Sequence, residues 1–153
     1  MNTALRISAL LILVALSGCA TVQYGDKNLE QELKKLSSAP GKVSLYVCRE
    51  NAVFFGAGAV ITAVVDKTPI GALKPNNFAH TTLTAGRHEI YLDRGPLNSN
   101  SGVLSIEAKE GDVVLVWAGM TGGGFGVLTV DMFASKTEGE QCVRGATYAI
   151  RSQ

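Results

Sequence analysis

From Lys42 onward, short runs of alternating apolar and polar residues are separated by turn residues. This period of two predicts half-buried β-strands, since successive side chains of a strand point to opposite faces. The run 112–118 differs because it is apolar on both faces, which is typical of a central strand covered on both sides. We expect a second sheet on one side of it and a helix on the other. The predicted strands span residues 43–48, 60–65, 68–73, 78–83, 88–93, 103–108, 112–118, 127–133 and 146–150.

Short polar connections join several of these strands. Asp66-Lys67, residues 84–87 and residues 109–111 each lie between two strands and predict three β-hairpins. The last strand, 146–150, is expected at a sheet edge. Short strands at this spacing, with no internal repeat, predict a mainly β, antiparallel β-sandwich.

Two short helices are expected beside the strands. Asp26 can cap the first, in which Leu29, Leu33 and Leu36 share one face and Glu30 can pair with Lys34. The Ser-Ser-Ala-Pro-Gly run that follows ends this helix, because proline cannot continue it. Residues 135–142 predict a short second helix near the C-terminus.

The N-terminal run is a leader sequence. Arg6 precedes an apolar stretch shorter than a membrane span, and small residues follow it. Leu16-Ser17-Gly18-Cys19 resembles the lipobox of bacterial lipoproteins. The resemblance implies diacylglyceryl transfer to the Cys19 sulfur, cleavage before Cys19 and acylation of the new amine. An ordinary secretory signal with a chance cysteine is the alternative.

The lipobox divides the chain into three parts: residues 1–18 as signal peptide, 19–41 as lipid-anchored tether with its helix, and 42–153 as the sandwich domain. Ala20 follows the anchor, where an aspartate would signal inner-membrane retention in enteric-type bacteria. We therefore expect the outer membrane, with the domain facing the periplasm.

Charge excludes some classes of partner. The chain has 14 basic and 13 acidic residues, and the leader contributes Arg6 and no acid, so the remainder is neutral. A neutral domain lacks the basic footprint of nucleic-acid binding. It also lacks a polybasic membrane contact, which leaves the lipid to hold the chain at the membrane.

Two of the three cysteines remain once Cys19 carries lipid. Cys48 and Cys142 are an even pair in an oxidising compartment, where disulfides form and persist. Neither has a C-x-x-C neighbour that would favour a metal site. A Cys48–Cys142 disulfide is the favoured reading, and two separate buried thiols are the alternative.

Four segments resemble a domain-of-unknown-function family found in bacterial lipoproteins. Residues 45–49 (LYVCR) are similar to its "LYVYR" strand, and 65–73 (VDKTPIGAL) to its "VDGKPVGxL" hairpin. Residues 85–88 (AGRH) are similar to its "PGxH" turn, and 110–112 (EGD) to its "AGK" turn. The resemblance covers roughly residues 41–142.

This sequence departs from the family pattern at three places. Cys48 replaces an aromatic residue, Lys67 replaces the turn glycine, and the Gly-rich segment from Thr121 is unfamiliar. The resemblance implies a compact transthyretin-like or Ig-like β-sandwich. No activity and no catalytic residues come with it.

The sequence does not predict an enzyme. If residues 84–87 form a hairpin that pairs Leu83 with His88, then His80 and His88 point to opposite faces of one sheet and cannot share a metal or act together. No serine sits in a nucleophile elbow, and neither cysteine has a neighbouring histidine. We expect no cofactor and no metal.

The two glycine-rich segments, 51–58 and 121–126, are the predicted contact surface. Glycine weakens strands, so its concentration beside aromatic residues suits close approach of a partner. The alternative is that the glycines only form turns and the rings are buried. A phosphate-binding loop is disfavoured, because a strand follows 121–126 and no lysine appears before Lys136. The residues of this surface are Phe54, Phe55, Gly122, Gly123, Gly124 and Phe125.

The expected function is a non-enzymatic interaction or structural module of the cell envelope. Its partners would be the membrane, through the lipid on Cys19, and another envelope protein or a wall polymer. A carrier for a small apolar ligand is the alternative, and an envelope hydrolase is a distant third. A carrier needs an unfilled cavity. Bulky apolar residues, with Trp117 among them, are expected to fill the interior instead.

Overall fold

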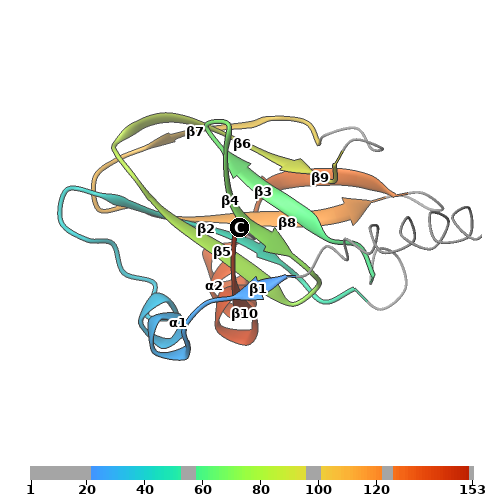
Figure 1. Cartoon of the computed structure of the whole chain (residues 1–153). Helices are drawn as coiled ribbons and strands as arrows, with labels where there is room; N and C mark the ends of the chain where they lie inside the picture. Colours follow the sequence, from blue (N-terminus) through green and yellow to red (C-terminus); the bar gives the residue numbers. More distant parts are fainter. Residues whose placement is uncertain (1–21, 53–57, 96–100, 122–125, 152–153) are drawn as a thin grey trace, which may run out of the picture.

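The computed structural model describes residues 22–52, 58–95, 101–121 and 126–151 as a β-sandwich with two helices (Figure 1). The elements in chain order are β1 (Gln23–Tyr24), α1 (Lys27–Leu33), β2 (Val43–Arg49), β3 (Ile61–Val65), β4 (Thr68–Leu73), β5 (Asn77–Leu83), β6 (Gly86–Asp93), β7 (Leu104–Ala108), β8 (Val113–Thr121), β9 (Val127–Met132), α2 (Lys136–Gly145) and β10 (Thr147–Ile150). The predicted fold class is confirmed. The nine predicted strands are all present, within a few residues of their expected ends.

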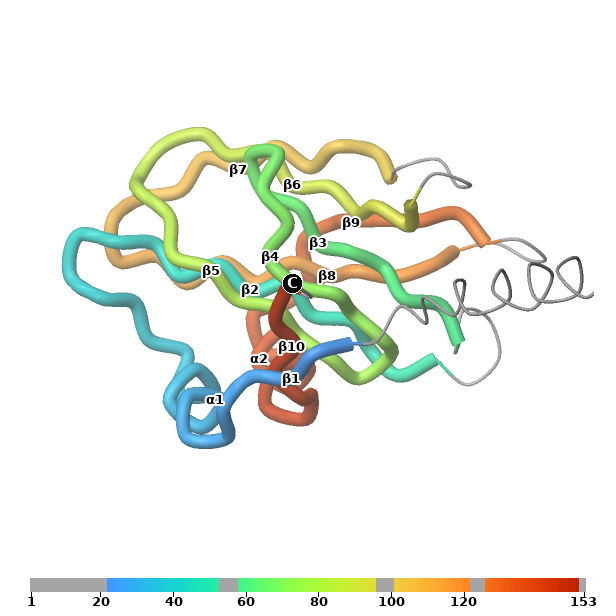
Figure 2. The backbone as a smooth tube through the Cα atoms, in the orientation of Figure 1, coloured from blue at the N-terminus to red at the C-terminus, as the bar shows by residue number. Residues whose placement is uncertain are grey.

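The strands form two sheets that face each other (Figure 2). A six-stranded sheet has the order β1-β10-β5-β2-β8-β9, and a four-stranded sheet has the order β4-β3-β6-β7. The pairs β2–β8 and β10–β5 are parallel, and the other pairs are antiparallel. The sandwich is therefore mixed rather than purely antiparallel.

Of the three predicted hairpins, one is confirmed and two are wrong. β3 and β4 pair across Asp66 and Lys67, both with positive φ, as two-residue hairpin turns require. Residues 84–85 instead connect β5 in the six-stranded sheet to β6 in the four-stranded sheet. Residues 109–112 connect β7 in the four-stranded sheet back to β8 in the six-stranded sheet. Gly86 and Gly111 have φ of 131° and 88°, so glycine supplies the conformation at which each strand turns away.

The core between the sheets is filled by thirteen buried side chains, each at most 6% exposed. β8 contributes to both faces of the six-stranded sheet, as its two-sided apolar pattern predicts. Val116 and Ala118 face the four-stranded sheet, while Leu115 lies in a second apolar cluster under α2. β2 is central beside β8, and all its residues are buried. The prediction of a half-buried strand at 43–48 is therefore wrong, because β2 packs on the core between the sheets with one face and on the second cluster with the other.

Helix α1 begins at the predicted cap. The Asp26 carboxylate accepts hydrogen bonds from the backbone N–H groups of Asn28 and Leu29, at 2.8 and 3.1 Å. Lys34 Nζ lies 2.7 Å from Glu30 Oε1, the expected i,i+4 pair. The predicted leucine stripe is only partly used: Leu33 and Leu36 pack on the second cluster, but Leu29 is 47% exposed.

Helix α2 extends further than predicted, and β10 is not an edge strand. Ser135 caps α2, which continues to Gly145 instead of ending at residue 142. β10 lies between β5 and the two-residue strand β1, which pairs with it and takes the edge position (Figure 1). The expectation failed because β1 lies in the segment that the sequence pattern marked only as a tether.

Candidate functional site

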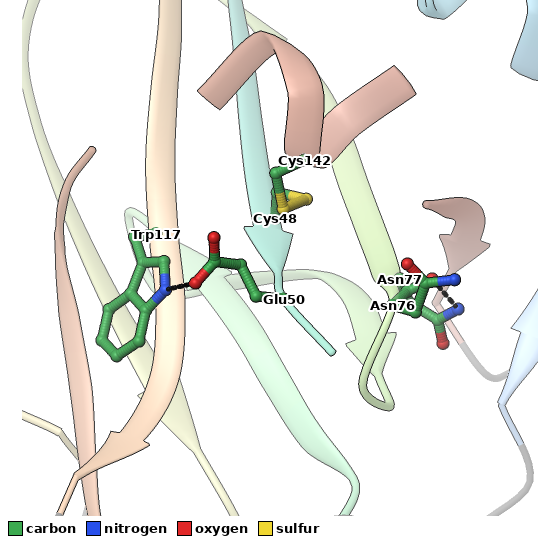
Figure 3. Close-up of a disulfide and its surroundings, with 6 residues drawn as sticks. All are labelled: Cys48, Glu50, Asn76, Asn77, Trp117 and Cys142. Atoms are coloured by element: carbon green, nitrogen blue, oxygen red, sulfur yellow. Dashed lines mark hydrogen bonds between the residues drawn. A yellow bond between two sulfur atoms is a disulfide. The ribbon is translucent and has the colours of Figure 1, made fainter. Parts of the chain in front are cut away.

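The predicted disulfide between Cys48 and Cys142 is confirmed. It joins β2 to α2, with the two Cα atoms 6.2 Å apart and a sequence separation of 94 (Figure 3). The Cys48 side chain points away from the core between the sheets, into the cluster that also contains Tyr46, Phe78 and Val143. The bridge therefore fastens α2 to the outer face of the six-stranded sheet.

The other predicted site residues lie outside the residues that the structure describes. These are Cys19, Phe54, Phe55, Gly122, Gly123, Gly124 and Phe125. The described residues that flank the two glycine-rich segments do have a fixed relation. β2 and β8 are parallel neighbours, so Arg49 and Thr121, at their C-terminal ends, lie at the same end of the sheet. We call this the carboxyl end of the sandwich.

A small hollow lies at the carboxyl end, with a volume of about 110 Å³. We call it the Trp117 hollow. Its lining residues come from the end of β2 with the three residues after it, and from the second half of β8. They are Arg49, Glu50, Asn51, Ala52, Trp117, Ala118, Gly119 and Met120.

Trp117 is held in one orientation. Its indole Nε1–H donates to Glu50 Oε2 at 3.0 Å (Figure 3). The ring lies over Gly119, where a Cβ atom would overlap the indole. The strand alternation of β8 places both residues on the same face, so glycine is the residue that lets the ring lie flat along its own strand.

The position of Trp117 corrects one expectation from the sequence. In the β2–β8 register, Trp117 is level with Cys48, so its side chain leaves the sheet on the helix side. It is half-buried and takes no part in filling the core between the sheets. Asp131 of β9 pairs with Trp117 across the strands and is exposed on the same face.

Arg49 is one of the residues that line the hollow. It is 2% exposed, and its Nη1 donates to the carbonyl oxygens of Ala59 at 2.6 Å and Leu73 at 2.9 Å. Burial, with a smaller effect from the nearby Arg94, lowers the pKa of Arg49 to about 10, so the group remains a cation at neutral pH. The Asn76 N–H donates to the Arg49 carbonyl at 2.9 Å, which holds the end of β2.

The two histidines lie in different sheets, because β5 and β6 do not pair with each other. The predicted register that pairs Leu83 with His88 is therefore wrong: Leu83 pairs with Val43 and His88 with Ile106. The His80 ring packs against Tyr46 with centroids 4.7 Å apart, and its buried Nε2 has no hydrogen-bond partner among the described residues. Burial lowers the pKa of His80 to about 4.

His88 has a structural role. Its Nδ1 lies 2.6 Å from Asp66 Oδ2, and its Nε2 lies 2.9 Å from the Thr84 carbonyl oxygen. Burial works to lower its pKa, but the hydrogen bonds to Asp66 and Thr84 outweigh burial and raise it. Asp66 also accepts the Glu89 N–H at 3.0 Å, so this network ties the β3–β4 hairpin to β6.

The chemistry available at the carboxyl end is recognition through an aromatic face and polar groups. Within the described ranges, no group of three histidine, cysteine, aspartate or glutamate residues could hold a metal ion. Sequence reasoning missed the Glu50–Trp117 pair. A usable signal was present: Glu50 directly follows the strand β2, and Trp117 is the chain's single tryptophan.

None of the helices in the described ranges has the length and apolar character needed to span a bilayer. Comparisons with protein-family models, with curated proteins and with solved structures gave no match.

Proposed function

We propose that this chain is a lipid-anchored lipoprotein of the outer membrane that faces the periplasm and acts as a non-enzymatic interaction module of the envelope. The observation that carries the proposal is the Cys48–Cys142 disulfide. Disulfides persist in oxidising compartments and are rare in the cytosol. The bridge thus supports export, which the leader ending at Cys19 independently predicts.

The packing of the sandwich favours an interaction module over a carrier for apolar ligands. A carrier requires an internal cavity, and ligand pockets typically measure roughly 300–1,000 Å³. The described residues instead fill the space between the sheets with thirteen buried side chains. The Trp117 hollow, at about 110 Å³, is too small to enclose a lipid-like ligand.

The carboxyl end is the proposed contact surface. Both glycine-rich segments adjoin described residues at this end, and Asn51, Ala52 and Met120, which line the Trp117 hollow, lie in or next to these segments in sequence. The Trp117 indole is half-buried and donates a hydrogen bond to the exposed Glu50 carboxylate. Folding of the core does not require this pair, so we assign it to recognition. Loops on a rigid scaffold are the usual place for recognition.

Lipidation at Cys19 is the first expected result. Mass spectrometry of the N-terminal peptide from native membranes should find Cys19 carrying diacylglyceryl and an acylated amine. More than one acyl chain makes the anchoring stable, whereas one chain would be marginal. The Cys19→Ala protein should leave the membrane fraction, and an unmodified Cys19, or a Cys19→Ala protein that stays in the outer membrane, would refute the anchor.

Site-directed crosslinking tests the contact surface. A photoreactive amino acid in place of Asn51, which is exposed beside the hollow, should crosslink an envelope component in intact cells. The matched control is the same amino acid in place of the exposed Glu110, at the opposite end of β8. Crosslinks from Glu110 but not from Asn51 would place the interaction surface elsewhere.

A further inference from the structure

We propose that the Trp117 hollow binds one pyranose ring of an uncharged glycan, with the sugar stacked on the Trp117 indole. This inference rests on the proposed function and names its partner class. The occupant is a saccharide of the envelope rather than a protein segment. Three features of the hollow carry the inference: a fixed aromatic face, exposed hydrogen-bonding groups around it, and small size.

The aromatic face is preorganised. The hydrogen bond from Trp117 Nε1 to Glu50 fixes the ring in its plane, and Gly119 lies against one side of the ring. A pyranose ring presents several C–H bonds on one face, and these stack on an indole that does not need to reorient. A fixed ring loses little conformational entropy on binding, which improves affinity.

The polar groups around the indole match hydroxyl groups. Glu50 and Asp131 are exposed carboxylates that accept hydrogen bonds, and the exposed Asn51 amide both donates and accepts. Sugar hydroxyls do the same. Thr121 and Thr129, whose hydroxyl oxygens lie 2.8 Å apart on the same face, extend this polar surface along β8 and β9.

Charge disfavours anionic ligands. Glu50 and Asp131 are exposed carboxylates on the face of the indole, so an anion would meet like charges there. The Arg49 guanidinium donates instead to the carbonyl oxygens of Ala59 and Leu73 and does not offset this repulsion at the indole. A neutral ligand with hydroxyl groups avoids the repulsion and can donate hydrogen bonds to both carboxylates.

Size limits the contact to one ring. The hollow of about 110 Å³ is smaller than pockets that enclose drug-sized ligands, roughly 300–1,000 Å³. It can receive one ring of a longer chain while neighbouring sugars remain outside. We therefore expect weak binding per site, in the micromolar to millimolar range, for a soluble fragment.

The test uses the fluorescence of the single tryptophan. The probe is an N-acetylglucosamine tetramer, titrated into the folded chain without its leader. Stacking on Trp117 should give a saturable change in intensity or wavelength of the emission. Glu50→Ala should weaken binding at least tenfold, and the matched variant Glu110→Ala, with an exposed carboxylate at the other end of β8, should bind like the unaltered protein.

Calorimetry completes the test, because Trp117→Leu has no tryptophan emission. This variant should show no measurable heat of binding while its circular dichroism spectrum and melting temperature remain close to those of the unaltered protein. If Trp117→Leu does not fold, the comparison of Glu50→Ala with Glu110→Ala decides whether the tetramer binds at the Trp117 hollow. No emission change up to 10 mM tetramer, or equal binding by Glu50→Ala and Glu110→Ala, would overturn the glycan inference.

The crosslinking experiment separates this inference from the proposed function. A crosslink from position 51 to glycan material supports both. A crosslink from the same position to a protein alone overturns the glycan inference and leaves the interaction module standing. Absence of any crosslink at position 51, together with a Cys19→Ala protein retained in the membrane, would contradict the proposed function itself.

Discussion

Replacing both Cys48 and Cys142 with alanine is expected to lower the free energy of unfolding by about 3 to 5 kcal/mol. The bridge joins residues 94 apart in sequence, and in the chain-entropy model a closed loop of about 100 residues is worth about 4.7 kcal/mol. Alanine avoids burying a hydroxyl group in the apolar cluster under α2. Urea unfolding, monitored by circular dichroism, measures the loss.

The control for this prediction is the unaltered chain measured with and without reductant. Because most of the effect acts on the unfolded ensemble, the reduced protein should resemble the double variant in stability, and its unfolded state should be less compact. The m-value of the double variant should therefore exceed that of the oxidised chain. A loss below about 1 kcal/mol would show that α2 holds its place on the sheet without the bridge.

Acidification from pH 6.5 to pH 4 is expected to destabilise the folded chain through His80 by about 2 to 3 kcal/mol. The folded-state pKa of His80 is about 4, below its ordinary value of 6.5, so the unfolded chain binds the extra proton first. The stability that neutral His80 provides is fully present above pH 6.5 and is lost as the pH falls through 4. The cause is the burial of an imidazole whose Nε2 has no partner among the described residues.

His80→Phe tests this expectation, since phenylalanine keeps a ring against Tyr46 and removes the titration. The stability of this variant should change much less between pH 6.5 and pH 4. The matched control is His88→Gln. The raised pKa of His88 stabilises the fold below pH 6.5, and this stabilisation is lost as the pH rises through the folded-state pKa. If His80→Phe retains the full acid dependence, another group is responsible.

The local features of the fold were predictable because neighbouring residues determine them. The Asp26 cap and the turn at Asp66-Lys67 are each decided within a few residues. The pairing of Cys48 with Cys142 was also predicted, because the expected lipidation of Cys19 leaves these two cysteines as an even pair. These predictions needed no knowledge of distant contacts.

The assignment of strands to sheets was not predictable from the same patterns. The connections 84–85 and 109–112 are as short as hairpin turns, yet each crosses between the sheets. Alternation tells which face of a strand is apolar, but both sheets offer an apolar surface to that face. Contacts between segments distant in sequence decide which sheet each strand joins, and they place β2 parallel to β8.

The candidate site depended on tertiary structure in the same way. Glu50 and Trp117 are far apart in sequence, and only the parallel β2–β8 register places the carboxylate beside the indole nitrogen. The burial of Arg49 and of His80 Nε2 likewise comes from the elements packed around them. The sequence by itself determined the strands, the first helix and the cysteine pair through local periodicity and elimination. Tertiary structure decided the order of strands and the recognition surface, because both arise from contacts between segments whose patterns are locally equivalent.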